Sequence, residues 1–143
     1  MVNISKLMIG DWVKTNPSCG KLVCDIKSNI AMVSEIGFSN SDGMYVTLVG
    51  TNGRYYDDEL EPIQLTDEIL EKNGFEKYDG GGYIIKELTD DEMPSLYIWD
   101  GNYSLCVVDF YSSNRYTDIK NCKYVHELQH ELKSCGIVKS IKL

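Results

Sequence analysis

Apolar residues between Ile9 and Leu65 come in short runs of strand length, and turn-forming residues separate these runs. Glycine and asparagine tolerate positive φ, and serine and aspartate form local side-chain turns. Asn52-Gly53 gives the clearest hairpin prediction, because a type I′ turn needs positive φ at both central residues. The pattern predicts an SH3-like small β-barrel or curled sheet. Its expected strands are DWVKT, KLVCDI, IAMVSEI, MYVTLVG and RYYDDELEPIQL.

Beyond Pro62 the pattern changes to helices and strands in turn. LTDEILEKNGF predicts a short helix, which Thr66 caps and Gly74 ends. Strands are expected at GFEKY and YIIKEL, which the glycine-rich residues 79–82 connect, and at SLYIWD and YSLCVVDFY. An amphipathic helix is predicted from about Cys122 to Ser134, followed by IVKSIKL as a last strand. The predicted core side chains of this half are Tyr83, Ile85, Leu96, Ile98, Leu105, Val107 and Phe110.

These elements predict an α+β fold of two lobes. Residues 1–65 form the β-rich SH3-like lobe, and residues 66–143 form the αβ lobe with the C-terminal amphipathic helix and last strand. The connection from Glu61 to Thr66 is short, so the two lobes are expected to share one core.

The charge balance narrows the range of partners. The sequence holds 14 lysines and arginines against 22 aspartates and glutamates, a formal net charge of −8. Such a field repels phosphate backbones and anionic lipid surfaces. Nucleic acid is therefore a disfavoured partner, and a nucleic-acid-associated SH3-like barrel is kept only as a weaker alternative.

Cysteine usage and the first residues favour a cytoplasmic protein. Five cysteines form no C-x-x-C pair, which argues against a disulfide framework and a zinc ribbon. The N-terminal residues lack the layout of a secretory signal. No apolar stretch approaches the roughly 18 residues of a membrane span, so no membrane association is expected.

The segment HELQH, residues 126–130, fits the HExxH pattern of zinc peptidases. In that pattern His126 and His130 would hold the metal, and Glu127 would polarise the attacking water. A third ligand would have to be an upstream carboxylate or cysteine, because the residues after Glu131 contain no histidine, aspartate or glutamate. A zinc-dependent hydrolase is therefore an alternative and not the leading interpretation.

A helical wheel also argues against the zinc site. At about 100° per residue, Tyr124, Leu128 and Leu132 form an apolar stripe, and His126 and His130 fall on the opposite side. Both histidines are thus expected to face solvent. One arrangement still favours metal: if the helix begins early, Cys122, His126 and His130 are spaced by four residues and could chelate zinc on its surface.

Two further features concern binding. The acidic run Asp57-Asp58-Glu59 lacks the ligand spacing of an EF-hand, so a solvated face or an edge-strand charge explains it better. The sequence also contains ten tyrosines and two tryptophans. Some of these side chains must be partly exposed, and exposed aromatic clusters favour protein interfaces.

The segments IGDWV, ELEPIQLTDEILEKNGF and YVHELQHELKSCGI occur in this order and span nearly the whole chain. With these segments the sequence resembles a family of short uncharacterised proteins of Bacteroides and of their phages and mobile elements. The resemblance implies similarity over the full length, and the family has no known activity. The resemblance implies no catalytic residues. A protein-binding module would fit an accessory role in phage or mobile-element biology.

Together these observations predict a small, non-enzymatic α+β protein that acts by binding another protein. No cofactor is expected under this interpretation, and zinc only under the hydrolase alternative. The sequence leaves the oligomeric state open.

Overall fold

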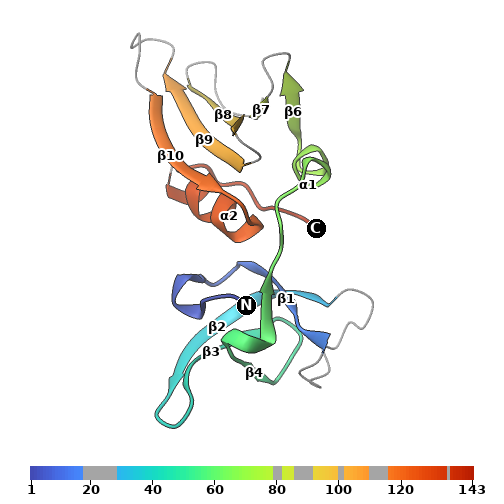
Figure 1. Ribbon diagram of the computed structural model, residues 1–143, viewed down its shortest axis with the longest axis vertical. Coiled ribbons are helices and arrows are strands. Elements are labelled where there is room, and N and C mark those ends of the chain that lie inside the picture. Colours follow the sequence, from blue (N-terminus) through green and yellow to red (C-terminus); the bar gives the residue numbers. More distant parts are fainter. Residues whose placement is uncertain (18–28, 79–81, 86–91, 100–101, 110–115, 135) are drawn as a thin grey trace. The chain divides into compact units, whose positions relative to one another are not determined.

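The computed structural model describes residues 1–17, 29–78, 82–85, 92–99, 102–109, 116–134 and 136–143. The fold is mixed α+β, with antiparallel strands and two α-helices (Figure 1). Contacts within the chain divide it into two compact units, Met1–Ile63 and Gln64–Leu143, here called unit 1 and unit 2. The shared core stays a prediction.

Unit 1 is an antiparallel sheet with short 3₁₀ turns. Its strands are hydrogen-bonded in the order β4-β3-β2-β1-β5. No closed barrel forms among the described strands, so the barrel alternative is wrong for this part of the chain. The elements are η1 (Ile4–Lys6), β1 (Trp12–Thr15), β2 (Ile30–Ser39), β3 (Gly43–Leu48), β4 (Arg54–Tyr55), η3 (Asp57–Glu59) and β5 (Leu60–Pro62).

The tight turn of unit 1 lies between β2 and β3. Gly43 has a φ of 84°, a backbone angle that residues with a side chain rarely adopt. Asp42 before it accepts hydrogen bonds from the hydroxyl groups of Ser39 and Ser41. The hairpin predicted around Asn52-Gly53 does form, because β3 and β4 pair antiparallel, but its turn is not the expected two-residue turn. Residues 49–53 instead form a longer connection in which Gly50 takes the positive φ of 80°.

One apolar core holds unit 1 together. Alternation along the strands explains it: in β1, for example, Val13 and Thr15 are buried and Lys14 between them is exposed. Backbone bonds tie the N-terminal segment to the sheet, with Val2 N donating to Leu60 O at 3.2 Å. The core comprises Val2, Ile4, Leu7, Val13, Ala31, Val33, Val46, Leu48, Tyr55 and Leu60.

Unit 2 is an antiparallel meander with two helices. Its strand order, β10-β9-β8-β7-β6, follows the chain. Helix α2 packs against β9 and β10, and helix α1 packs against β6 (Figure 1). The elements are α1 (Asp67–Lys72), β6 (Phe75–Tyr78), β7 (Gly82–Ile85), β8 (Glu92–Trp99), β9 (Asn102–Asp109), β10 (Tyr116–Cys122) and α2 (Val125–Ser134).

The first helix forms as its sequence predicts. Thr66 Oγ1 accepts a hydrogen bond from Ile69 N at 3.3 Å, which satisfies one of the amides left open at the helix start. Gly74, with a φ of 75°, follows the last turn. The helix buries Leu70 completely.

The core of unit 2 lies between the helices and the sheet. Among the predicted core residues, Tyr83 is confirmed as fully buried. The side chains of Ile85, Leu96, Ile98, Leu105 and Val107, the whole of Phe110 and residues 79–81 lie outside the described part. Among the residues of this unit whose side chains the structure describes, the buried apolar ones are Leu65, Leu70, Phe75, Tyr83, Cys122, Val125, Leu128, Leu132, Ile137 and Ile141.

The predicted last strand, residues 137–143, is wrong, because this segment pairs with no strand among the described residues. Near its end, the backbone of this segment bonds to the side chain of Asn73. Asn73 Nδ2 donates to Lys142 O at 2.8 Å, and Lys142 N donates to Asn73 Oδ1 at 2.7 Å. Asn73 Nδ2 also donates to Ile69 O at 2.7 Å. We call this arrangement the Asn73 clamp; it holds the end of the chain beside α1 (Figure 1).

Two tyrosines surround the carboxylate at the start of α1. Tyr103 donates to Asp67 Oδ1 at 2.5 Å, and Lys77 Nζ lies 3.5 Å from Asp67 Oδ2. The Tyr103 hydrogen bond is the main cause that lowers the pKa of Asp67. Burial, together with the nearby Asp67 carboxylate, raises the pKa of Tyr83 to about 12.

Alkaline pH is expected to weaken the fold through Tyr83. An unfolded tyrosine loses its proton near pH ~10, whereas Tyr83 in the folded chain holds it to about 12. The stability from this group is therefore complete below the unfolded pKa and is lost as the pH rises toward the folded pKa. In urea unfolding at a series of pH values, Tyr83→Phe should lose less stability than the wild type between neutral pH and this range. Equal losses would contradict the assignment.

Candidate functional site

HELQH lies at the start of α2, and its glutamate has a structural role. Glu127 Oε2 accepts hydrogen bonds from Lys123 N at 2.7 Å and from Tyr124 N at 3.1 Å. Both amides precede the helix, where backbone donors lack intrahelical partners. Glu127 therefore closes the helix start, as the glutamate of a capping box does.

The histidines do not both face solvent, so that prediction is wrong for His126, which is only 7% exposed. Its ring stacks on Tyr124, with centroids 5.8 Å apart and planes within 8°. The half-buried His130 meets the His126 ring edge-on at 6.0 Å. The helical wheel treated Tyr124 as a helical residue on the apolar stripe. In the structure Tyr124 precedes α2, which begins at Val125, and its ring stacks on His126.

Cys122 is the last residue of β10, where it pairs with Tyr103, and it is fully buried. The expected strip of Cys122, His126 and His130 on one helix is therefore wrong, since α2 begins three residues after Cys122. The strand keeps the thiol in the core of unit 2 instead of on a helix surface.

A zinc hydrolase needs a third ligand and a glutamate that reaches the metal-bound water. In the described ranges, no group of three or more histidine, cysteine, aspartate or glutamate side chains is arranged to hold a metal ion. The carboxylate of Glu127 already accepts two backbone hydrogen bonds. The geometry of HELQH therefore supports a structural role at the start of α2, where Glu127 accepts backbone amides and the Tyr124 ring stacks on His126.

Glu127→Ala is expected to lower the free energy of unfolding by about 0.5–2 kcal/mol, the usual range for loss of a helix cap. Glu127→Gln keeps an oxygen that can accept the same amides, so its effect should be smaller. Urea unfolding of the two variants measures the difference. If Glu127→Ala matches the wild type, the capping role is wrong.

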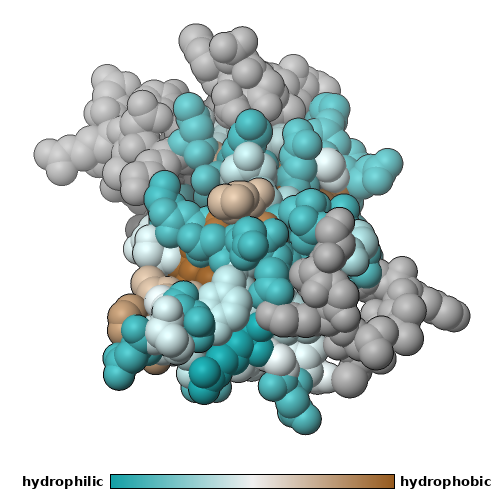
Figure 2. All heavy atoms as spheres, turned by 60° about the horizontal axis from the view of Figure 1, so that its bottom comes forward, coloured by the Kyte–Doolittle hydropathy of each residue, from teal (hydrophilic) through white to brown (hydrophobic). Residues whose placement is uncertain are grey.

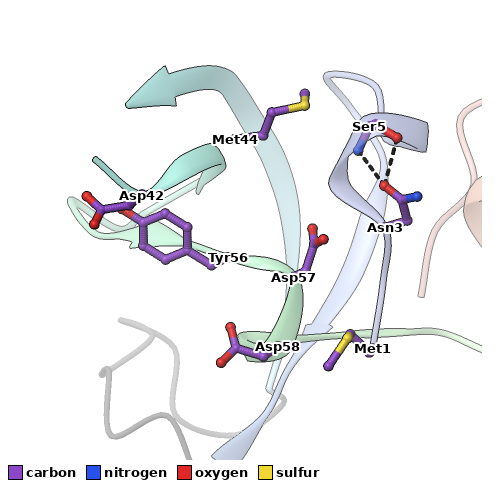
Figure 3. A pocket seen from close by; sticks show the side chains of 8 residues that line it. All are labelled: Met1, Asn3, Ser5, Asp42, Met44, Tyr56, Asp57 and Asp58. Atoms are coloured by element: carbon purple, nitrogen blue, oxygen red, sulfur yellow. Dashed lines mark hydrogen bonds between the residues drawn. The ribbon is translucent and has the colours of Figure 1, made fainter. Parts of the chain in front are cut away.

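A second feature is a pocket of unit 1 with a volume of about 450 Å³. Three segments that lie far apart in the sequence meet around it: the N-terminal residues with η1, the β2–β3 hairpin, and the stretch from Tyr56 through η3 (Figure 3). We call it the acidic pocket. Its lining residues are Met1, Asn3, Ser5, Asp42, Met44, Tyr56, Asp57 and Asp58.

Short-range hydrogen bonds shape the acidic pocket. Asn3 Oδ1 accepts bonds from Ser5 N at 3.0 Å and Ser5 Oγ at 2.7 Å, which starts η1 (Figure 3). Ile4 N donates to Asp57 Oδ1 at 2.9 Å and joins the N-terminal segment to η3. The N-terminal segment and η3 are thus fixed to each other within unit 1.

The pocket is negatively charged with apolar edges. Its lining contains three carboxylates, those of Asp42, Asp57 and Asp58, and no lysine or arginine side chain. Hydrogen bonds from Ser41 and Ser39 lower the pKa of Asp42, so its carboxylate stays ionised to lower pH than usual. Met1 is 83% exposed and Met44 is 41% exposed. The arrangement suits a cation that carries an apolar stem.

Sequence reasoning found part of this site and gave it another meaning. Asp57 and Asp58 were expected on a solvated face, and both are exposed. Their approach to Asp42 and to the N-terminal residues depends on the β2–β3 hairpin and the Ile4–Asp57 bond. No local pattern encodes such contacts between distant segments.

No protein-family model, curated protein or solved structure matches the chain. Among the helices that the structure describes, none is long and apolar enough to cross a membrane.

Proposed function

We propose that this chain is a small, non-enzymatic protein-binding module, and that its acidic pocket receives a cationic side chain of a partner protein. The observation that carries the proposal is the lining of the pocket: three carboxylates, two methionines and a tyrosine around one opening (Figure 3). Lysine and arginine offer a charged head on an apolar stem, which fits such a lining.

An apolar edge beside the pocket supports a protein partner. Phe38 is 69% exposed and lies opposite Met44 in the β2–β3 pairing. Cross-strand partners share one face of a sheet, so these two side chains form one apolar contact. On the face seen in Figure 2, hydrophobic side chains drawn in colour form small areas among hydrophilic ones. A short segment with one apolar neighbour beside its cation would fit this surface.

Three further elements of the proposal have different support. Unit 1 is taken as an SH3-like curled sheet, supported by its short antiparallel strands and single apolar core. A cytoplasmic location is supported by the cysteine usage. An accessory role in phage or mobile-element biology is supported by the sequence resemblance alone.

The test is isothermal titration calorimetry with a capped peptide in which leucines flank one arginine. Asp42→Asn with Asp58→Asn should weaken binding about two- to thirtyfold, because each exposed charge pair contributes ~0.2–1 kcal/mol. Asparagine retains an acceptor oxygen, so the fold is expected to persist. Added salt should also weaken binding to the wild type.

The matched control is Glu68→Gln with Glu76→Gln, which removes the same charge from exposed positions of unit 2. It should leave the affinity near that of the wild type. The same peptide with glutamate in place of arginine should not bind. Equal weakening by both double variants would mean that only the net charge matters, and the acidic pocket would lose its assignment.

A further inference from the structure

The sequence contains two Asn-Gly pairs, Asn52-Gly53 and Asn73-Gly74. In such a pair the backbone nitrogen of glycine can attack the asparagine Cγ, because glycine has no side chain to hinder the approach. A C–N bond forms and closes a succinimide ring, the Cγ–Nδ2 bond breaks, and Nδ2 leaves as ammonia with the proton from the glycine nitrogen. Water then opens the ring and gives aspartate or isoaspartate.

The two Asn-Gly pairs differ in exposure and in the hydrogen bonds of the asparagine side chain. Asn52 is exposed in the connection between β3 and β4, and no hydrogen bond joins its side chain to another described residue. Asn73 is 9% exposed, and its amide takes part in the three bonds of the Asn73 clamp. The leaving group Nδ2 donates to two carbonyls, so it is held in place.

The backbone at Asn73 also opposes the reaction. Its ψ of 16° turns the Gly74 nitrogen away from the side chain, whereas ring closure needs that nitrogen and Cγ on the same side of the Cα–C bond. In addition, Gly74 N donates to Glu71 O at 3.0 Å. Attack requires this bond to break and the backbone to rotate.

We propose that Asn73-Gly74 is a latent deamidation site, which reacts only after residues 137–143 have left the Asn73 clamp and the last turn of α1 has opened. The reaction then makes the release permanent. A carboxylate has no N–H to donate, so it would face the Ile69 and Lys142 carbonyl oxygens with a negative charge. Deamidation at Asn73 thereby converts a transient opening into a lasting loss of the docked segment.

The test is peptide mass spectrometry of the full chain after incubation in mildly alkaline buffer, with and without concentrated urea. In urea both pairs are expected to react at similar rates, since each precedes glycine. Without urea, Asn73 should react at least about tenfold more slowly than Asn52, because only the locally open fraction of the chain reacts. Similar rates at the two pairs in the folded chain would overturn the proposal.

A variant outside the reacting pair separates the clamp from general burial. Lys142→Pro removes the N–H that donates to Asn73 Oδ1 and leaves Asn73-Gly74 unchanged. It should raise the rate at Asn73 toward that at Asn52, which serves as the internal standard. Circular dichroism identifies whether the variant is folded. An unchanged rate at Asn73 in the folded variant would also overturn the proposal.

Discussion

Asn73→Ala is expected to lower the free energy of unfolding by about 2–3 kcal/mol, because three partly buried backbone groups lose their partner at once. Those groups are Ile69 O, Lys142 O and Lys142 N, which the Asn73 amide joins at 2.7–2.8 Å. Urea unfolding measures the loss. Hydrogen exchange should also show faster exchange at residues 137–143, which the clamp holds.

The control is Asn52→Ala, at an exposed asparagine that also precedes glycine. Its effect should stay within about 0.5 kcal/mol, as for most surface substitutions. A similar small effect at Asn73 would mean that residues 137–143 are held mainly by their apolar contacts, such as the burial of Ile141.

Leu128→Ala is expected to have a larger effect, about 2–5 kcal/mol, the range for a fully buried leucine whose removal leaves a cavity. Leu128 is completely buried in α2, which packs on β9 and β10. Thermal unfolding followed by circular dichroism measures the loss. Val138→Ala is the control, because Val138 is fully exposed and its truncation leaves no cavity. Equal effects of the two substitutions would show that α2 does not pack through Leu128.

Local patterns predicted much of the fold. Thr66 and Gly74 marked the ends of α1 because their roles depend only on the adjacent backbone. Most described strands of both units follow runs of alternating or apolar residues, as the α+β prediction required. Tyr83 was predicted in the core and is buried there.

Predictions failed where contacts between distant segments of the sequence determine the local structure. The last strand was expected at residues 137–143, but Asn73, about seventy residues earlier, binds that backbone. The wheel of α2 failed because strand pairing in β10 continues to Cys122 and delays the helix start. The acidic pocket combines three distant segments, and only its Asp57-Asp58 pair gave any signal in the sequence.

The HELQH pattern illustrates how one motif can carry two meanings. Its spacing is that of a metal-binding helix, and a glutamate at the same place can also accept the amides before the helix start. The short distances from Glu127 Oε2 to Lys123 N and Tyr124 N favour the second role. The hydrogen bonds at the helix start, and not the sequence motif, distinguish these two roles.

The proposed use of the acidic pocket is tested most directly by nuclear magnetic resonance of the labelled chain during titration with the leucine-flanked arginine peptide. Amide shifts concentrated at residues 42–44 and 56–58, with saturation, are the result that the proposal predicts. No shifts, or shifts confined to α2 and the strands of unit 2, would contradict it.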